Sequence, residues 1–247
     1  MAQGLPQGDP PEELTEVEEQ AAPTEIDALQ VAEPVTLDHL GWFDAFSHLS
    51  RRRAVTVQVP FAPPPGFMGR GIELAKARKA LQTGMPCVVY GEPGAGRTSF
   101  CVQALASPET ATLFPGGVLW LDARALDLPS LCDEVARYLD DDQVLKAEDH
   151  ESKIQTLRGL LARQDLLVVL DQLRDETVAA RYCQRVSSHV LVTSEGPVHL
   201  NSVCNIHLGG LSEEEAMGCF RAHAGRVAGY DEQIAAICAL LSHHPLA

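Results

Sequence analysis

The fold is decided by Val88-Val89-Tyr90-Gly91-Glu92-Pro93-Gly94-Ala95-Gly96-Arg97-Thr98-Ser99-Phe100. This stretch matches the phosphate-loop pattern G-x-x-x-x-G-K-[ST] at every fixed position except the lysine, which is replaced by Arg97. A short apolar run, Cys87 to Tyr90, predicts a buried strand before it, and Ser99 to Ala106 predicts the start of a helix after it. The alternative is an ordinary Gly/Pro turn between a strand and a helix.

The residue types in this loop suit the binding of a phosphate. The glycines allow the backbone to wrap an anion with its N–H groups, and the positive end of the following helix points at the same anion. Thr98 would place a hydroxyl on Mg²⁺. The predicted phosphate-binding residues are Gly91, Gly94, Ala95, Gly96, Arg97, Thr98 and Ser99.

Charge is distributed unevenly along the 247 residues, whose formal net charge is −15. Residues 1–50 carry eleven Asp and Glu and no Lys or Arg, so they contribute −11 of that total. The remainder is nearly balanced and shows no basic face, so we expect no nucleic-acid partner. Nor does an apolar run reach the roughly 18 residues of a membrane span, and a signal peptide is not evident.

Seven cysteines are scattered through the chain without paired spacing. Their odd number argues against a disulfide framework, and the absence of C-x-x-C argues against zinc. We therefore expect a reducing, cytoplasmic setting. The acidic turn Asp140-Asp141-Asp142 is predicted to be a solvated loop rather than a metal site.

The first 66 residues differ from the rest. Residues 1–34 are rich in Pro, Glu, Gln and Ala, a composition that predicts a disordered acidic tail. The stretch from Leu37 to Arg53 predicts an amphipathic helix, in which Leu40, Phe43, Phe46 and Leu49 are spaced three residues apart. This helix either docks on the main domain or binds a partner in a groove. Val55 to Val59 alternates like a strand, and a proline-rich connector follows it.

Strand and helix patterns alternate after the loop. A helix is expected over Ala75 to Leu81, and strands are expected over Gly117 to Asp122, Leu166 to Asp171, His189 to Thr193 and Cys204 to Leu208. Further helices are expected over Leu128 to Leu139 and Ile154 to Leu161. This order predicts an α/β fold with a doubly wound parallel sheet of about five strands, and ligands at the carboxyl ends of the strands.

The last third is helical. Ser212 and Glu215 form a capping-box pattern that starts a helix running to Ala224. A second helix is expected over Glu232 to Ser242, with Ile234, Ile237, Leu240 and Leu241 facing inward. The predicted parts are thus a tail (1–34), a helix and linker (35–66), a nucleotide-binding domain (67–209) and the start of a small helical domain (210–247).

In this order the motifs resemble the NB-ARC branch of the signal-transduction ATPases, the STAND class, over roughly residues 67–247. The resemblance rests on six stretches besides the loop. They are Phe67-Met68-Gly69-Arg70, Pro115 to Asp122, Leu166 to Asp171, Leu191 to Ser194, Leu208 to Ala216 and His243-His244-Pro245-Leu246-Ala247.

The resemblance implies a P-loop NTPase that binds ADP or ATP with Mg²⁺ and acts as a molecular switch in signalling or defence. Family roles carried to matching positions put Phe67, Met68 and Arg70 on the adenine side and Pro245 against the base. Thr98 and Asp171 would hold Mg²⁺. Exchange of ADP for ATP would open the protein to oligomerise with other subunits.

Four departures from the family pattern are present, and three of them fall on the γ-phosphate side. Arg97 replaces the loop lysine, Gln172 follows Asp171 where many relatives have a second carboxylate, and Glu195 adds negative charge near a γ-phosphate. His243 replaces the glycine of the final motif. We expect weak or absent hydrolysis, in which Asp171 and Gln172 would be the catalytic candidates. The chain also ends before the family's winged-helix domain, so it is either a fragment or a minimal switch.

Two other functions fit the same residues. One is an active P-loop ATPase that couples turnover to work. The other is a degenerate scaffold that binds no nucleotide and recruits a partner through the helix over Leu37 to Arg53. Retained nucleotide would separate the switch and the ATPase from the scaffold, and steady turnover would separate the ATPase from the switch.

Overall fold

The computed structural model of the chain describes residues 65–187, 189–224 and 229–245. The sequence-based expectations for the acidic tail, for the helix over 37–53 and for the strand over 55–59 fall outside these residues.

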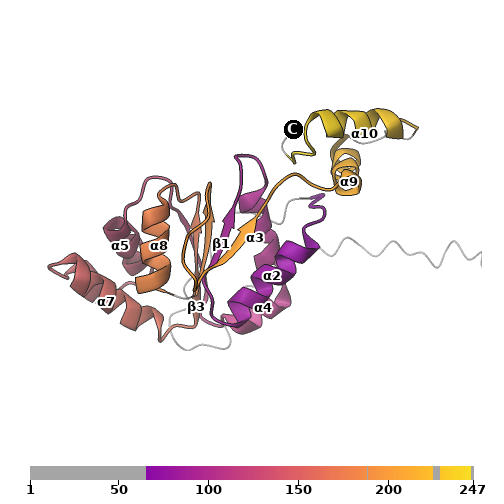
Figure 1. Ribbon diagram of the computed structural model, residues 1–247. Helices are drawn as coiled ribbons and strands as arrows, with labels where there is room; N and C mark the ends of the chain where they lie inside the picture. The colour runs from indigo at the N-terminus through magenta and orange to yellow at the C-terminus, as the bar shows by residue number, and fades with distance from the viewer. Residues whose placement is uncertain (1–64, 188, 225–228, 246–247) are drawn as a thin grey trace, which may run out of the picture. The chain divides into compact units, whose positions relative to one another are not determined.

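A single parallel sheet forms the centre of the described chain (Figure 1). Its five strands lie in the order β2-β3-β4-β1-β5, and every neighbouring pair is parallel. The strands are β1 (Cys87–Tyr90), β2 (Gly117–Asp122), β3 (Leu166–Asp171), β4 (Val190–Ser194) and β5 (Cys204–His207). The predicted α/β class and five-stranded doubly wound sheet are confirmed.

Continuous apolar runs form the inner strands because both of their faces are covered. All six residues of β3 are buried, and so are all five of β4. Alternate side chains of β3 enter two separate clusters, with Val168 and Leu170 in one and Leu167 and Val169 in the other. The sheet therefore separates two apolar layers.

Helices cover both faces of the sheet (Figure 1). On one face, α5, α7 and α8 supply the partners of the first cluster, and on the other α2 and α3 supply those of the second. The helices up to β5 are α2 (Gly71–Gln82), α3 (Arg97–Leu105), α4 (Pro108–Leu113), α5 (Leu128–Tyr138), α6 (Asp142–Leu145), α7 (His150–Leu161) and α8 (Glu176–Arg185).

Some helices of the structure were not predicted from the sequence. The helices α4 and α8 were not foreseen, although each has a capping side chain, Ser107 and Asp175 respectively. The acidic turn is not a plain loop, because Asp141 caps the short helix α6 and accepts hydrogen bonds from the backbone N–H groups of Gln143 and Val144. Asp142 is the first residue of that helix.

In the described part of the chain two helices follow the sheet, α9 (Glu213–Ala224) and α10 (Asp231–Leu240). The predicted capping box at the start of α9 is present. The N–H of Ser212 donates to Glu215 Oε2 at 2.9 Å, and the N–H of Glu215 donates to Ser212 Oγ at 3.3 Å. Both groups would otherwise lack a helical partner, so the pair defines where α9 begins.

The predicted inner face of α10 is partly wrong. Ile234 is buried, but Ile237, Leu240 and Leu241 are exposed, with Leu240 86% accessible. Cys238 is the second buried residue, one helical turn after Ile234. The reason is that α10 packs against α9 along a narrow stripe, so only one residue per turn finds apolar neighbours.

Candidate functional site

The glycine-rich loop lies between β1 and α3, as the sequence predicts for a phosphate loop. At its start the backbone of Gly91 passes very close to the residue that follows β5, since a Cβ placed there would lie 2.3 Å from the carbonyl oxygen of Leu208. The neighbouring Leu208 N–H donates to the carbonyl oxygen of Tyr90 at 2.8 Å. Glycine is therefore required at position 91 for the loop to leave the sheet edge.

A chain of three oxygen-bearing side chains lies beneath the loop. Thr98 Oγ1 lies 3.0 and 3.2 Å from the two carboxylate oxygens of Asp171 and donates to that carboxylate. Thr193 Oγ1 donates to Asp171 Oδ1 at 2.6 Å. Asp171 is only 4% exposed and Thr193 is fully buried, so the carboxylate is held in one orientation by two hydroxyl groups.

The side chains of Thr98 and Asp171 are suitable ligands for a hard divalent cation. The two predicted Mg²⁺ ligands, Thr98 and Asp171, are in direct contact, and both present oxygen atoms. Within the described ranges, no group of three or more His, Cys, Asp and Glu side chains could hold a metal ion. A hydroxyl and one carboxylate fit Mg²⁺ completed by water and phosphate oxygens, which is the arrangement that this ion prefers.

The residue that replaces the loop lysine is tied to the sheet. The Arg97 guanidinium donates to the backbone carbonyl oxygen of Ser194, the last residue of β4. Ser194 is aligned with Tyr90 in the parallel register, so Arg97 links the start of α3 to the neighbouring strand end. Its charged group in this structure is directed at a protein carbonyl.

Two of the remaining three departures, Gln172 and Glu195, lie at the same edge of the sheet. The Gln172 side chain is exposed, its backbone has a left-handed φ of 61°, and its N–H donates to Thr193 Oγ1 at 2.6 Å. Glu195 is exposed directly after β4. Asp122, at the end of β2, binds Arg124, and that side-chain hydrogen bond holds the pKa of Asp122 below its usual value.

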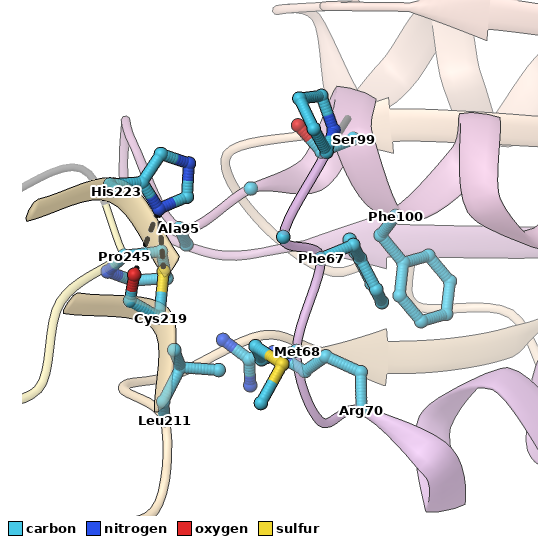
Figure 2. A pocket seen from close by; sticks show the side chains of 13 residues that line it. Phe67, Met68, Arg70, Ala95, Ser99, Phe100, Leu211, Cys219, His223 and Pro245 are labelled. Carbon is cyan, nitrogen blue, oxygen red and sulfur yellow. Dashed lines mark hydrogen bonds between the residues drawn. The ribbon is translucent and has the colours of Figure 1, made fainter. Parts of the chain in front are cut away.

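A pocket of about 170 Å³ opens beside the loop (Figure 2). It brings together residues from three distant parts of the chain, including Phe67, Met68, Arg70 and Pro245, which the resemblance placed around a base. Its wall also includes two loop residues. The lining residues are Pro65, Gly66, Phe67, Met68, Arg70, Ala95, Gly96, Ser99, Phe100, Leu211, Cys219, His223 and Pro245.

The segment before α2 is fitted closely against α9. A Cβ at Gly69, whose φ is 70°, would lie 2.2 Å from the Glu215 carboxyl group, and one at Gly218 would lie 2.6 Å from the Met68 methyl group. Arg70 is 7% exposed and donates to the carbonyl oxygen of Gly209 at 2.5 Å. One wall of the pocket thus depends on contacts with α9.

Some residues of this site were not foreseen. Thr193 orients Asp171, and a buried threonine at the end of an apolar strand is the sequence signal that could have revealed it. Cys219 and His223 line the pocket from one face of α9, and His223 Nδ1 lies 2.8 Å from the Cys219 carbonyl oxygen. Their spacing of four residues indicates a shared face, but nothing in it indicates a pocket.

Comparison with known proteins clarifies the architecture. No protein-family model matches the sequence, and the search of curated proteins found no match. Among solved structures, a STAND protein with a tetratricopeptide-repeat sensor from Pyrococcus horikoshii is similar, with a TM-score of 0.55 and 18% identity over 72% of this chain. Cdc6p from Pyrobaculum aerophilum is similar with a TM-score of 0.50 and 14% identity over 72% of this chain.

The chain has the P-loop NTPase fold. It spans 28% of the length of the Pyrococcus horikoshii protein and 56% of the length of Cdc6p. At these identities the likeness shows the fold alone. In the structure itself the loop follows the carboxyl end of β1, and Asp171 is the last residue of β3. No helix in the described part of the chain is long and apolar enough to cross a bilayer.

Proposed function

We propose that this chain is the nucleotide-binding module of an NB-ARC-like STAND switch, which binds ADP or ATP with Mg²⁺ and hydrolyses ATP weakly or not at all. The observation that carries the proposal is the pocket in which Phe67, Met68 and Pro245 meet Ala95 and Gly96 of the loop and Ser99 of α3. A nucleotide needs an apolar wall for its base next to a phosphate loop, and this pocket offers both.

The phosphates are assigned to the loop and to the start of α3. Gly94 and Gly96 have φ values of 86° and 88°, a backbone conformation that glycine adopts readily. Helix α3 begins at Arg97, so its unpaired N–H groups and positive dipole face the same space. Thr98 and Asp171 would hold Mg²⁺, which neutralises charge on the phosphate oxygens when it is bound.

We expect weak hydrolysis because of the side chains that would surround the γ-phosphate. The Arg97 guanidinium donates to the carbonyl oxygen of Ser194. Gln172 has no negative charge with which to activate water, and the carboxylate of Glu195 would repel the phosphate. Phosphoryl transfer depends on positioning and on neutralising charge at the transferred group. Each departure would cost about 10–100-fold in rate, or roughly 1.4–2.7 kcal/mol.

A switch also needs a part whose position depends on the bound nucleotide. We assign residues 67–209 to the nucleotide-binding domain and 210–247 to the start of a helical domain, whose residues Leu211, Cys219 and His223 reach the pocket. A ligand there would contact both parts. The likeness to a STAND protein supports this assignment, and oligomerisation with other subunits on activation is part of the proposal.

Titration calorimetry with ADP and Mg²⁺ tests the site. Asp171→Asn keeps the shape of the side chain but removes its charge, and Thr98→Ala removes the hydroxyl group. Each should weaken Mg²⁺-dependent binding by at least about tenfold, or about 1.4 kcal/mol. The matched control is Asp142→Asn, since this carboxylate is 74% exposed and pairs only with Lys146 among the contacts described.

Equal affinity in all three variants would remove the phosphate-loop assignment. Failure of the unaltered protein to bind ADP or ATP would favour the scaffold alternative. Binding with rapid turnover would favour the ATPase.

A further inference from the structure

Two cysteines lie directly opposite one another on neighbouring strands. Cys87 is the first residue of β1, Cys204 is the first residue of β5, and the parallel register pairs them. Neighbouring strands are about 4.8 Å apart, and disulfides join residues whose Cα atoms are about 4.4–6.8 Å apart. Opposed residues in a parallel pair point to the same face of the sheet, so both thiols lie on the side covered by α2 and α3.

The two thiols differ in their access to solvent. Cys87 is fully buried, whereas Cys204 is partly exposed because β5 is the edge strand. Lys76 lies beside Cys204, and its Nζ donates to the carbonyl oxygen of Asn205 at 2.8 Å. A small reagent can therefore reach Cys204 first, with Cys87 behind it.

The electrostatic surroundings agree with this order. A hydrogen bond from the Cys87 thiol lowers the pKa of Cys204, and the charge of Lys76 lowers it further, against an opposing effect of burial. The same contact, together with burial, raises the pKa of Cys87 well above its ordinary value. Burial raises the pKa values of Cys132 and Cys183 to about 12, so these two thiols are poor nucleophiles.

We propose that Cys204 and Cys87 form a thiol–disulfide exchange site for low-molecular-weight disulfides such as oxidised glutathione. The Cys204 thiolate attacks one sulfur of the small disulfide, forming a mixed disulfide and releasing one thiolate. The Cys87 sulfur then attacks the Cys204 sulfur and breaks the mixed disulfide, and the proton of Cys87 passes to the departing thiolate, which leaves as the second small thiol. The two cysteines lose two electrons in total, and the small disulfide is reduced to two thiols.

The product would link the strand that carries the phosphate loop to the strand that continues toward α9. Strand β1 runs directly into Gly91, and β5 continues through Leu208 to Gly209, the acceptor of the Arg70 guanidinium. A covalent bond between the first residues of β1 and β5 would fix that edge of the sheet. Thiol–disulfide exchange at these cysteines is separate from nucleotide binding and does not require it.

Oxidation of the full chain in glutathione buffers of graded potential tests the site, with alkylation and peptide mapping by mass spectrometry. The unaltered protein should form a Cys87–Cys204 linkage. Cys87→Ala should stop at a stable glutathione adduct on Cys204, and Cys204→Ala should yield neither product. Cys183→Ala, which removes a buried thiol on the other face, is the control and should behave like the unaltered protein.

A second measurement does not depend on the folding of the Cys87 variant. In the reduced unaltered protein at neutral pH, Cys204 should react with iodoacetamide at least about tenfold faster than Cys183, because reactivity follows access and thiolate content. Equal alkylation rates would overturn the proposal. So would a linkage of either cysteine to Cys101, or thiols at Cys87 and Cys204 that stay reduced at every glutathione ratio.

Discussion

The sheet and the pair of helices after it are built very differently. Strands β3 and β4 are buried along their whole length, between two apolar layers. Among the described residues, the core between α9 and α10 consists of four buried side chains, Leu211, Ala216, Ile234 and Cys238. Much of α10 is exposed, including Ile237 and Leu240. Stability therefore resides in the sheet.

Residues of both regions line the candidate site. The difference in how tightly the two regions are packed indicates which side of the site can move. Asp171 and Thr193 are buried on the sheet and hold one another by hydrogen bonds. Another wall of the pocket is formed by Leu211, Cys219 and His223. These residues belong to the helical region, whose apolar core is much smaller than that of the sheet. A nucleotide-dependent rearrangement would cost less at the helices than at the sheet, where it would disrupt buried apolar contacts.

The largest expected effect comes from the same substitution made in each region. Leu170→Ala deletes a fully buried side chain of β3 and should lower the free energy of unfolding by about 2–5 kcal/mol. Leu240→Ala removes a side chain that is 86% exposed and should change it by less than about 0.5 kcal/mol. Chemical denaturation of both variants measures the contrast, and similar losses would mean that α10 is as well packed as the sheet.

A smaller loss is expected when a polar group of the sheet is removed. Thr193→Val keeps the side-chain shape but deletes the hydroxyl that donates to Asp171 and accepts the Gln172 N–H. Leaving buried groups unpaired should destabilise the protein by about 1–3 kcal/mol. Thr193→Ser retains the hydroxyl and is the control. If the valine variant were as stable as the serine variant, these hydrogen bonds would contribute nothing to the frame of the site.

The smallest effect is expected at the start of α9. Ser212→Ala removes the hydroxyl of the capping box and should cost about 1 kcal/mol. The N–H of Ser212 holds the pKa of Glu215 below its usual value. The stabilisation by that carboxylate is therefore complete above the unfolded pKa of about 4.3 and is lost as the pH falls through the lower folded value.

Thermal unfolding of Ser212→Ala and of Glu215→Ala between pH 3 and pH 7 checks this assignment. The destabilisation caused by Glu215→Ala should shrink toward pH 3. A destabilisation that is independent of pH would show that the carboxylate charge is not involved.

Sequence alone predicted the parts of this fold that depend on local pattern. The bounds of β1 and β3 agree with the predictions, because an apolar run of four residues, and one of five residues closed by Asp171, indicate strands covered on both faces. Helix α8 was missed because five of its ten residues are polar or charged, so its apolar stripe is thin. The inner face of α10 was wrong because the neighbouring helix, and not the periodicity, decides which side is buried.

The candidate site likewise combines features that the local sequence predicts with contacts that it does not. The loop and Asp171 follow from a motif and from the end of a strand, and both lie where such patterns place them. The bond from Arg97 to Ser194 joins residues 97 positions apart. The contacts of Gly69 and Met68 with α9 also join distant segments. Such contacts depend on how segments pack in three dimensions, and no spacing along the chain encodes them.

ADP affinity, ATP affinity and steady-state ATP turnover, measured on one preparation with Mg²⁺, test whether the chain is a nucleotide-binding switch with weak hydrolysis. We expect ADP to bind at least as tightly as ATP, and turnover to lie far below the enzyme range of about 1 s⁻¹ or more. Turnover at ordinary enzyme rates that Asp171→Asn abolishes would contradict this expectation, since Arg97, Gln172 and Glu195 would then support efficient phosphoryl transfer.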